Sequence, residues 1–156
     1  MYYIENETKE LIDLKKVGKI LKLITAHFGE KRDFSVTFVD DVEIRRLNSE
    51  YRNMDNPTDI LTFRLDDGGE FPIVWDGEEE EVMEEEEMGD IFISMDSMRR
   101  NAKEFGVDEE EELSRLLLHG VLHLRGMDHE TNDFSTEPML IEQERIMSLL
   151  KLKVNR

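Results

Sequence analysis

The chain has 156 residues and a formal net charge of −18, with 38 Asp and Glu residues against 20 Lys and Arg. This length suits one domain with a substantial core, so we expect residues 1–156 to form a single domain. The absence of cysteine excludes disulfides and thiolate metal ligands. With no run long enough to span a membrane and no secretory signal, the sequence predicts a cytoplasmic protein without a membrane partner.

The N-terminal part predicts a short edge strand at residues 2–4, then a helix that Thr8 caps and that ends near Phe28. One face of this helix would be buried, formed by Leu11, Leu14, Val17, Leu21 and Ile24. The lysines lie largely off that face, at Lys15, Lys16, Lys19 and Lys22. They form either an ordinary solvated surface or a patch for nucleic acid.

The next elements are a strand, a helix and a second strand. Residues 34–39 are β-branched and aromatic, which is typical of a strand. Asp40 and Glu43 resemble a capping box for a helix that runs to about Glu50. After a polar loop, residues 60–65 predict another core strand.

A polar and acidic region follows. Residues 66–69 predict a turn, and residues 71–75 a short strand. Residues 76–87 contain nine acids and no base, half of the net −18. Such a segment cannot bury enough apolar surface to fold alone, so we expect a mobile acidic loop.

The C-terminal half predicts a buried strand at residues 89–94 and three helices. Ser94 would cap a helix over residues 95–105. Asp108 with Glu111 would cap a central helix over residues 109–125, and a last amphipathic helix covers residues 137–151. The order of elements indicates an α+β fold, a small mixed sheet covered by helices.

Three of the four histidines gather in residues 119–129, HGVLHLRGMDH. His119 and His123 would lie about 40° apart on one face of a helix. Gly126 can end that helix with a positive φ and bring back His129. A single histidine on an apolar helix is usually a packed core residue, but this spacing predicts a metal site.

Three protein ligands with an open fourth position are typical of a catalytic site. We expect one zinc ion, although nickel or another divalent transition metal also suits imidazole. Water on such an ion becomes a nucleophile near neutral pH. The histidine spacing equals that of the metzincin peptidases, HExxHxxGxxH, but Gly120 replaces their general-base Glu and argues against a peptidase.

With Gly120 in place, residues 119–129 resemble the HGxLHLxGxDH motif of the YbeY family of bacterial metal-dependent endoribonucleases. Two further stretches agree with that family. Residues 51–63, YRNMDNPTDILTF, resemble its arginine-containing loop and PTDVLSF-type strand, and residues 89–94, GDIFIS, resemble its GDI-type strand.

The resemblance implies helices packed on a mixed sheet around a cleft that holds the metal. It assigns the metal ligands to His119, His123 and His129. It also implies single-strand-specific RNA cleavage, maturation of the 3′ end of small-subunit (16S) rRNA, and ribosome quality control. The implied partners are single-stranded RNA and the ribosome or its proteins; no DNA partner is expected.

The resemblance also assigns a catalytic role to Arg52, and a guanidinium can stabilise the charge that develops on a phosphoryl group. Without the family, Arg52 reads as a surface residue. Asp128 could hydrogen-bond a ligand imidazole as a possible outer-sphere partner, assist proton transfer, or stabilise the turn after Gly126. Asp59 and Asp90 are expected to cap or brace the sheet.

The net charge opposes RNA binding, which depends on Lys and Arg contacts with phosphates. We therefore expect a local positive surface, formed by Arg52, Arg64, Arg125 and the metal, or a protein partner. Two alternatives remain: a metal hydrolase that acts on a peptide or another phosphoester, and a ribosome assembly factor with a structural metal.

Overall fold

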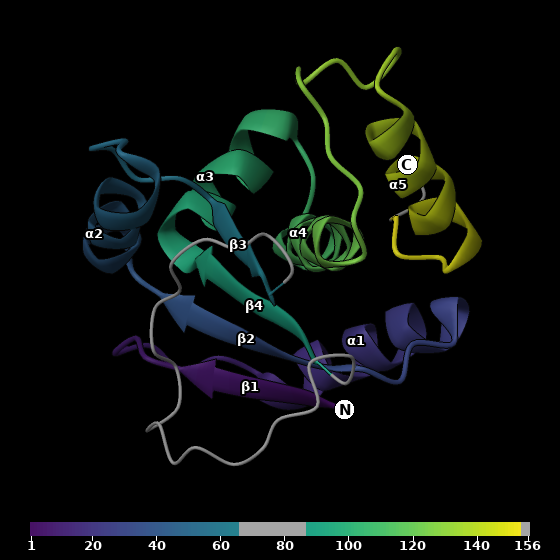
Figure 1. Ribbon diagram of the computed structural model, residues 1–156, viewed down its shortest axis with the longest axis horizontal. Coiled ribbons are helices and arrows are strands. Elements are labelled where there is room, and N and C mark those ends of the chain that lie inside the picture. Colours follow the sequence, from purple (N-terminus) through teal and green to yellow (C-terminus); the bar gives the residue numbers. More distant parts are fainter. Residues whose placement is uncertain (66–86, 154–156) are drawn as a thin grey trace.

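A four-stranded mixed sheet forms the centre of the computed structural model, which describes residues 1–65 and 87–153 (Figure 1). The strands are β1 (Tyr2–Asn6), β2 (Asp33–Val39), β3 (Ile60–Arg64) and β4 (Glu87–Ser94), in the spatial order β1-β2-β4-β3. β1, β2 and β4 are parallel, and β3 pairs antiparallel with β4. The predicted mixed sheet is confirmed. The turn and strand expected at residues 66–75, and the acidic segment up to residue 86, lie outside the described residues.

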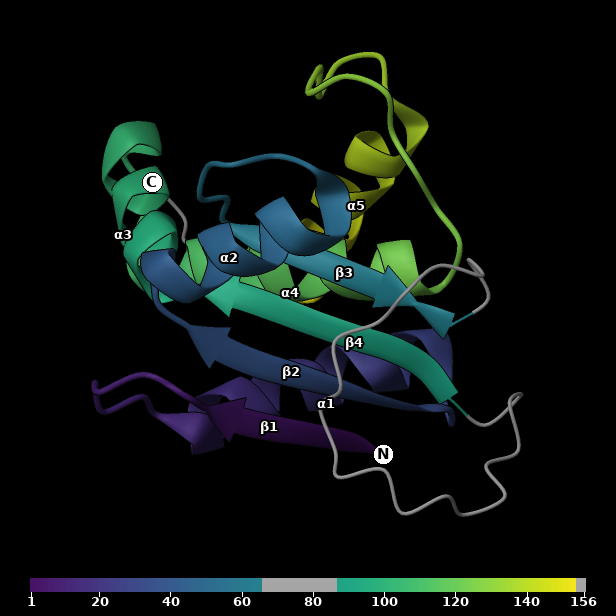
Figure 2. The ribbon, with the colours of Figure 1, turned by 60° about the vertical axis from the view of Figure 1, so that its left-hand side comes forward.

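Helices cover both faces of this sheet. They are α1 (Leu14–Phe28), α2 (Asp41–Arg52), α3 (Met95–Phe105), α4 (Glu109–Leu124) and α5 (Pro138–Leu149). Figure 2 shows α2 in front of the sheet and α1, α4 and α5 behind it. The central strands are therefore buried on both faces: Val36 and Ile93 face the larger core, while Val39 and Phe92 pack with the side chains of α2. Such strands lack strict alternation of apolar and polar residues.

The predicted capping residues act as expected. Asp40 accepts a hydrogen bond from the Glu43 backbone N–H at 2.9 Å, and Asp108 accepts one from Glu111 at 2.7 Å. Ser94 accepts from the Ser97 backbone N–H. Each cap satisfies a donor that the helix itself leaves unpaired. These helix starts are confirmed.

The predicted start of the first helix is wrong. Thr8 does not cap it, because the Thr8 hydroxyl and backbone N–H both donate to Asn6 Oδ1, at 2.6 and 2.9 Å. Asp13 caps the helix instead, by accepting from the Lys16 backbone N–H at 3.1 Å. Leu11, expected in the apolar stripe, therefore precedes the helix and is fully exposed. A local side-chain turn has replaced the first predicted helical turn.

Helix α4 is central, as predicted, and packs against α1, α3, α5, β3 and β4. It approaches the sheet closely at Gly120. A Cβ atom there would lie 2.8 Å from Ile91 Cδ1 and 3.2 Å from Ile60 Cδ1. The glycine thus sets how near the histidine-bearing helix can lie to the strands. Among the described helices, none is long and apolar enough to cross a membrane.

Candidate metal centre

The end of α4 brings the three predicted histidines together. His119 and His123 project from its last turns, and the helix ends with hydrogen bonds from Gly126 N to His123 O and from Met127 N to Leu122 O, both 3.0 Å. Gly126 has φ 103°, a conformation that a side chain would oppose. The chain therefore reverses after one turn, and His129 lies beside the other two imidazoles.

The geometry of the three rings suits a single ion. His119 Nε2 lies 3.1 Å from His123 Nε2 and 3.4 Å from His129 Nε2. A tetrahedral zinc ion with Zn–N bonds of about 2.05 Å would hold its ligand nitrogens about 3.3 Å apart. All three ligand atoms lie within 4.8 Å of one another. Among residues 1–65 and 87–153, these three histidines form the group of three or more potential ligand side chains that lie close enough together to hold a metal ion.

The Nδ1 atom of each histidine lies close to an oxygen atom that can accept a hydrogen bond. His119 Nδ1 lies 2.7 Å from Gln143 Oε1, His123 Nδ1 lies 3.3 Å from Asp128 Oδ1, and His129 Nδ1 lies 2.7 Å from the Thr131 carbonyl oxygen. Because oxygen acceptors require N–H donors, the protons belong on the Nδ1 atoms. Three Nε2 lone pairs then face one another.

Three convergent lone pairs repel one another unless a cation lies between them, so the donor set fits a divalent metal. Burial lowers the pKa of His119 to about 4, aided by the neighbouring His123. Burial is also the main cause that lowers the pKa of His123. Both imidazoles are therefore neutral at pH 7, the form that binds metal.

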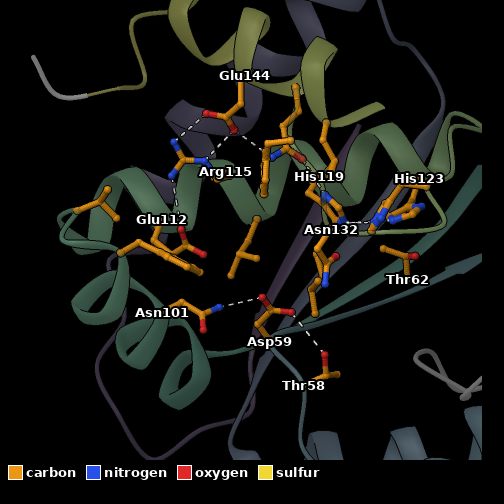
Figure 3. A pocket seen from close by; sticks show the side chains of 18 residues that line it. Thr58, Asp59, Thr62, Asn101, Glu112, Arg115, His119, His123, Asn132 and Glu144 are labelled. Atoms are coloured by element: carbon orange, nitrogen blue, oxygen red, sulfur yellow. Dashed lines mark hydrogen bonds and ion pairs between the residues drawn. The ribbon is translucent and has the colours of Figure 1, made fainter. Parts of the chain in front are cut away.

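A cavity of about 940 Å³ opens beside the histidines (Figure 3). All three histidines line it, together with residues of β3, α3 and α5, and with Asn132 and Phe134 of the chain before α5. Its size lies within the range of small-molecule sites. The metal group thus lies in the wall of a space that can hold a substrate.

Arg52 lies at the edge of this region. Its Nη2 donates to the Thr62 carbonyl oxygen at 2.6 Å, and its guanidinium lies 4.7 Å from the centre of the Phe63 ring. Thr62 lines the cavity and Arg52 does not. Arg52, the last residue of α2, therefore contacts β3 from outside the cavity.

Arg64 contacts the metal centre more directly. Its Nη1 donates to the His123 carbonyl oxygen at 3.2 Å and lies 3.9 Å from Asp128 Oδ2. Arg125, expected in the same positive surface, instead pairs with Glu30 and stacks over Phe28. That expectation was wrong for Arg125, because the partner comes from the loop after α1, which sequence spacing cannot reveal.

The two remaining carboxylates differ in position. Asp90 lies within the sheet and accepts a hydrogen bond from Ser35 at 2.5 Å, as a brace would. Asp59 accepts from Asn101 Nδ2 at 2.9 Å and lines the cavity. Asp59 therefore belongs to the cavity as well as to the sheet edge.

Sequence reasoning missed Gln143 as a partner of the histidines. It lies on the buried face of α5 with Met139 and Ile146, and it is 1% exposed. A polar side chain on such a face signals a buried partner, because an unpaired buried amide is costly. The identity of that partner depends on how α5 packs over α4.

The fold and the site together define a class: an α+β protein whose buried helix and following turn present three imidazoles, suited to one divalent metal, beside a substrate-sized cavity. More specifically, the chain belongs to the YbeY endoribonuclease family, whose model matches residues 3–151. The family expected from the sequence is confirmed, and with it the class of enzyme, a nuclease and hence a hydrolase.

Individual relatives agree with this assignment. The endoribonuclease YbeY of Treponema denticola is 42% identical over 129 residues, which cover 80% of this chain and 75% of the relative. That of Nautilia profundicola is 35% identical over 152 residues, 97% and 93% of the two chains. A Thermotoga maritima protein of known solution structure superposes with a TM-score of 0.59 at 29% identity, covering 96% of this chain and 89% of the other.

Proposed function

We propose that this chain is a metal-dependent endoribonuclease that cleaves single-stranded RNA. The observation that carries the proposal is the set of three convergent Nε2 atoms, each ring held through Nδ1, in the wall of a cavity in a YbeY-family fold. His119, His123 and His129 would hold one divalent ion, with zinc as the expected metal. When bound, such an ion supplies Lewis-acid activation of water and of the phosphoryl group.

Arg52 is the residue we assign to the phosphate. A guanidinium carries five N–H donors in a planar fork, and the contact with Thr62 uses one of them. Its stacking on Phe63 limits the directions in which the remaining donors point. Held this way beside the cavity wall, Arg52 can stabilise negative charge that develops on phosphoryl oxygens.

Asp128 is the residue we assign to the orientation of His123. Its Oδ1 lies 3.3 Å from His123 Nδ1, although the side chain is 71% exposed. A carboxylate in this place fixes the tautomer and raises the basicity of a ligand histidine. Arg64 lies 3.9 Å from the other oxygen of Asp128 and is its cationic neighbour.

The biological substrate we propose is the 3′ end of small-subunit rRNA, in maturation and in ribosome quality control in the cytoplasm. The net charge of −18 supports the proposal that the ribosome takes part in RNA binding. Because phosphate binding relies on cationic contacts, naked RNA would bind weakly and with strong salt dependence. The ribosome or its proteins would then supply contacts that the acidic chain lacks.

Two structural observations weigh against the alternatives. A peptidase of the metzincin type needs a carboxylate at position 120, and the space there is closed by Ile91 and Ile60. A structural metal would need a fourth protein ligand, whereas the group in the described part of the chain contains three.

The test compares single-stranded rRNA with casein as substrates of the metal-loaded protein. Cleavage of RNA alone is expected, with Arg52→Ala and His123→Ala reducing it at least a hundredfold. Arg46→Ala on the outer side of α2 and His27→Ala outside the metal centre serve as matched controls and keep full activity. RNA cleavage that persists in both site variants would identify a contaminating nuclease and refute the proposal.

A further inference from the structure

The cavity extends beyond the histidines towards the start of α4, where it ends in a second polar group (Figure 3). Glu112, Asp59 and Asn101 form this group. Glu112 precedes His119 by seven residues, about two helical turns or ~10 Å along the same face of α4. This separation is comparable to the span from a phosphate to the far edge of its own nucleobase.

Glu112 is buried beside the cavity. It is 3% exposed, and its carboxyl contacts Arg115, 3.5 Å from Nη1 to Oε1, and Asn101. Arg115 directs its shorter bonds elsewhere, at 2.9 Å to Glu144 and 3.0 Å to Glu111. The Glu112 carboxyl lines the cavity and has more lone pairs than these contacts use, so it can accept further hydrogen bonds from a ligand.

Burial disfavours the charged form of the two carboxyl groups. Burial raises the pKa of Glu112 to about 7, and the nearby charge of Asp59 adds to this effect. Burial raises the pKa of Asp59 as well. A ligand that brings N–H donors to these groups would stabilise the charged form, which accepts hydrogen bonds.

Two exposed aromatic side chains line the same cavity. Phe105 and Phe134 both line it, and they are 63% and 49% exposed, unusually open for large apolar residues. Buried Leu116 and Leu140 continue the apolar wall. Exposed rings beside an apolar wall suit a planar ligand, because RNA-binding proteins stack unpaired bases on aromatic side chains.

We propose that this end of the cavity is a nucleobase subsite that selects guanine next to the scissile phosphate, an inference that rests on the proposed endoribonuclease function. Guanine presents two adjacent donors, N1–H and N2–H, which match the two oxygens of one carboxylate. Uracil presents one N–H between two carbonyl oxygens, and those oxygens would face the carboxylate. Glu112 accepts the guanine edge, Asp59 with Asn101 completes the polar end, and Phe134 covers the base.

The test maps cleavage sites on a single-stranded RNA of mixed sequence. Wild-type protein is expected to cut next to guanine about tenfold more often than next to uracil, the effect of a hydrogen bond to a charged group. Glu112→Gln replaces one acceptor by a donor, so the ratio should fall to within twofold of one. Glu110→Gln, an exposed carboxyl on the same helix, leaves the ratio unchanged. A preference for another base, or a ratio unchanged in Glu112→Gln, overturns the proposal.

A second variant separates stacking from hydrogen bonding. Phe134→Ala should raise KM for guanine and uracil sites alike and leave their ratio unchanged, and the exposed position of Phe134 makes unfolding no concern. Calorimetric titration with guanosine and uridine 5′-monophosphates gives a readout without catalysis, with guanosine about tenfold tighter. Cleavage that is independent of His123 would refute the nuclease proposal alone. His123-dependent cleavage without guanine selection would refute the subsite alone.

Discussion

The side-chain oxygen of Gln143 accepts a hydrogen bond from Nδ1 of His119 at 2.7 Å. The amide is itself oriented, because Gln143 Nε2 donates to Glu144 Oε2 at 3.2 Å. Glu144 in turn pairs with Arg115 at 2.9 Å. A histidine of α4 is thus held by α5 through a chain of hydrogen bonds, and its Nε2 is left to the metal.

Gln143→Leu should weaken metal binding 10- to 100-fold, the usual effect of losing an outer partner of a ligand histidine. The volume is nearly unchanged, so the loss comes from the hydrogen bond. Zinc affinity measured by competition with a chromogenic chelator checks this. Gln143→Glu restores an acceptor and should recover affinity, and Ser148→Ala on the exposed side of α5 should have no effect. Equal affinity in Gln143→Leu would show that the contact does not support the ligand.

Removal of any one of His119, His123 or His129 should reduce bound metal from about one ion per chain to below a tenth of that, because two ligands hold zinc poorly. Native mass spectrometry gives the stoichiometry directly. His27→Ala is the control, since His27 packs edge-on against Phe28 and lies outside the group. Full metal content in all three single variants would place the ion elsewhere.

Gly120→Ala should destabilise the protein by about 1 to 3 kcal/mol, because the new methyl group meets Ile91 at 2.8 Å. This loss exceeds the gain of about 1 kcal/mol from helix propensity. Gly18→Ala in α1 is the matched control, since its Cβ would meet only Ile4 Cδ1, at 3.9 Å. That variant should be stabilised by about 0.5 to 1 kcal/mol. Urea denaturation measures the change in unfolding free energy of both variants. Changes of the same sign in the two variants would contradict the packing argument.

Glu30 should give the protein a stability component that disappears in acid. Its hydrogen bonds from Arg32, with help from the charge of Arg125, lower its pKa from 4.5 to about 2. A lowered folded-state pKa adds stability above pH 4.5 that is lost as the pH falls towards 2. Glu30→Gln should therefore cost about 1 to 2 kcal/mol at pH 7, after allowance for the partly exposed arginines.

Denaturation at several pH values checks the Glu30 prediction. The difference between wild type and Glu30→Gln should shrink steadily below pH 4.5 and vanish only below about pH 2. Glu142→Gln, which breaks a more exposed pair with Arg145, should change stability by less than about 0.5 kcal/mol. A Glu30→Gln effect that is independent of pH would assign the loss to packing instead of charge.

Local features of the chain were predictable because short-range chemistry determines them. Asp40 and Asp108 cap their helices through their own neighbouring N–H groups, and Gly126 ends α4 through its freedom at positive φ. The three-histidine spacing follows from one helix and one turn. Thr8 failed as a cap because Asn6 offered it a nearer partner.

Features that join distant segments were not predictable. Gln143 reaches His119 across 24 positions, and Arg125 reaches Glu30 across 95. The burial of Glu112 could not be predicted, because an acidic first turn of a helix is usually exposed to solvent. This burial depends on α3 and on the segment that carries Asp59, both of which line the cavity. Tertiary packing decided these positions.

The three histidines lie within eleven consecutive residues, whereas the cavity draws on segments from Thr58 to Glu144. An unfolded chain therefore keeps its metal-binding residues close together and can still chelate the ion. Thermodynamic linkage then limits what the metal contributes to folding, since only the difference in affinity between folded and unfolded chains counts. Zinc should therefore raise the melting temperature less than its affinity for the folded protein implies. A ligand of the cavity, which the unfolded chain cannot bind, should raise the melting temperature by the full amount that its affinity implies.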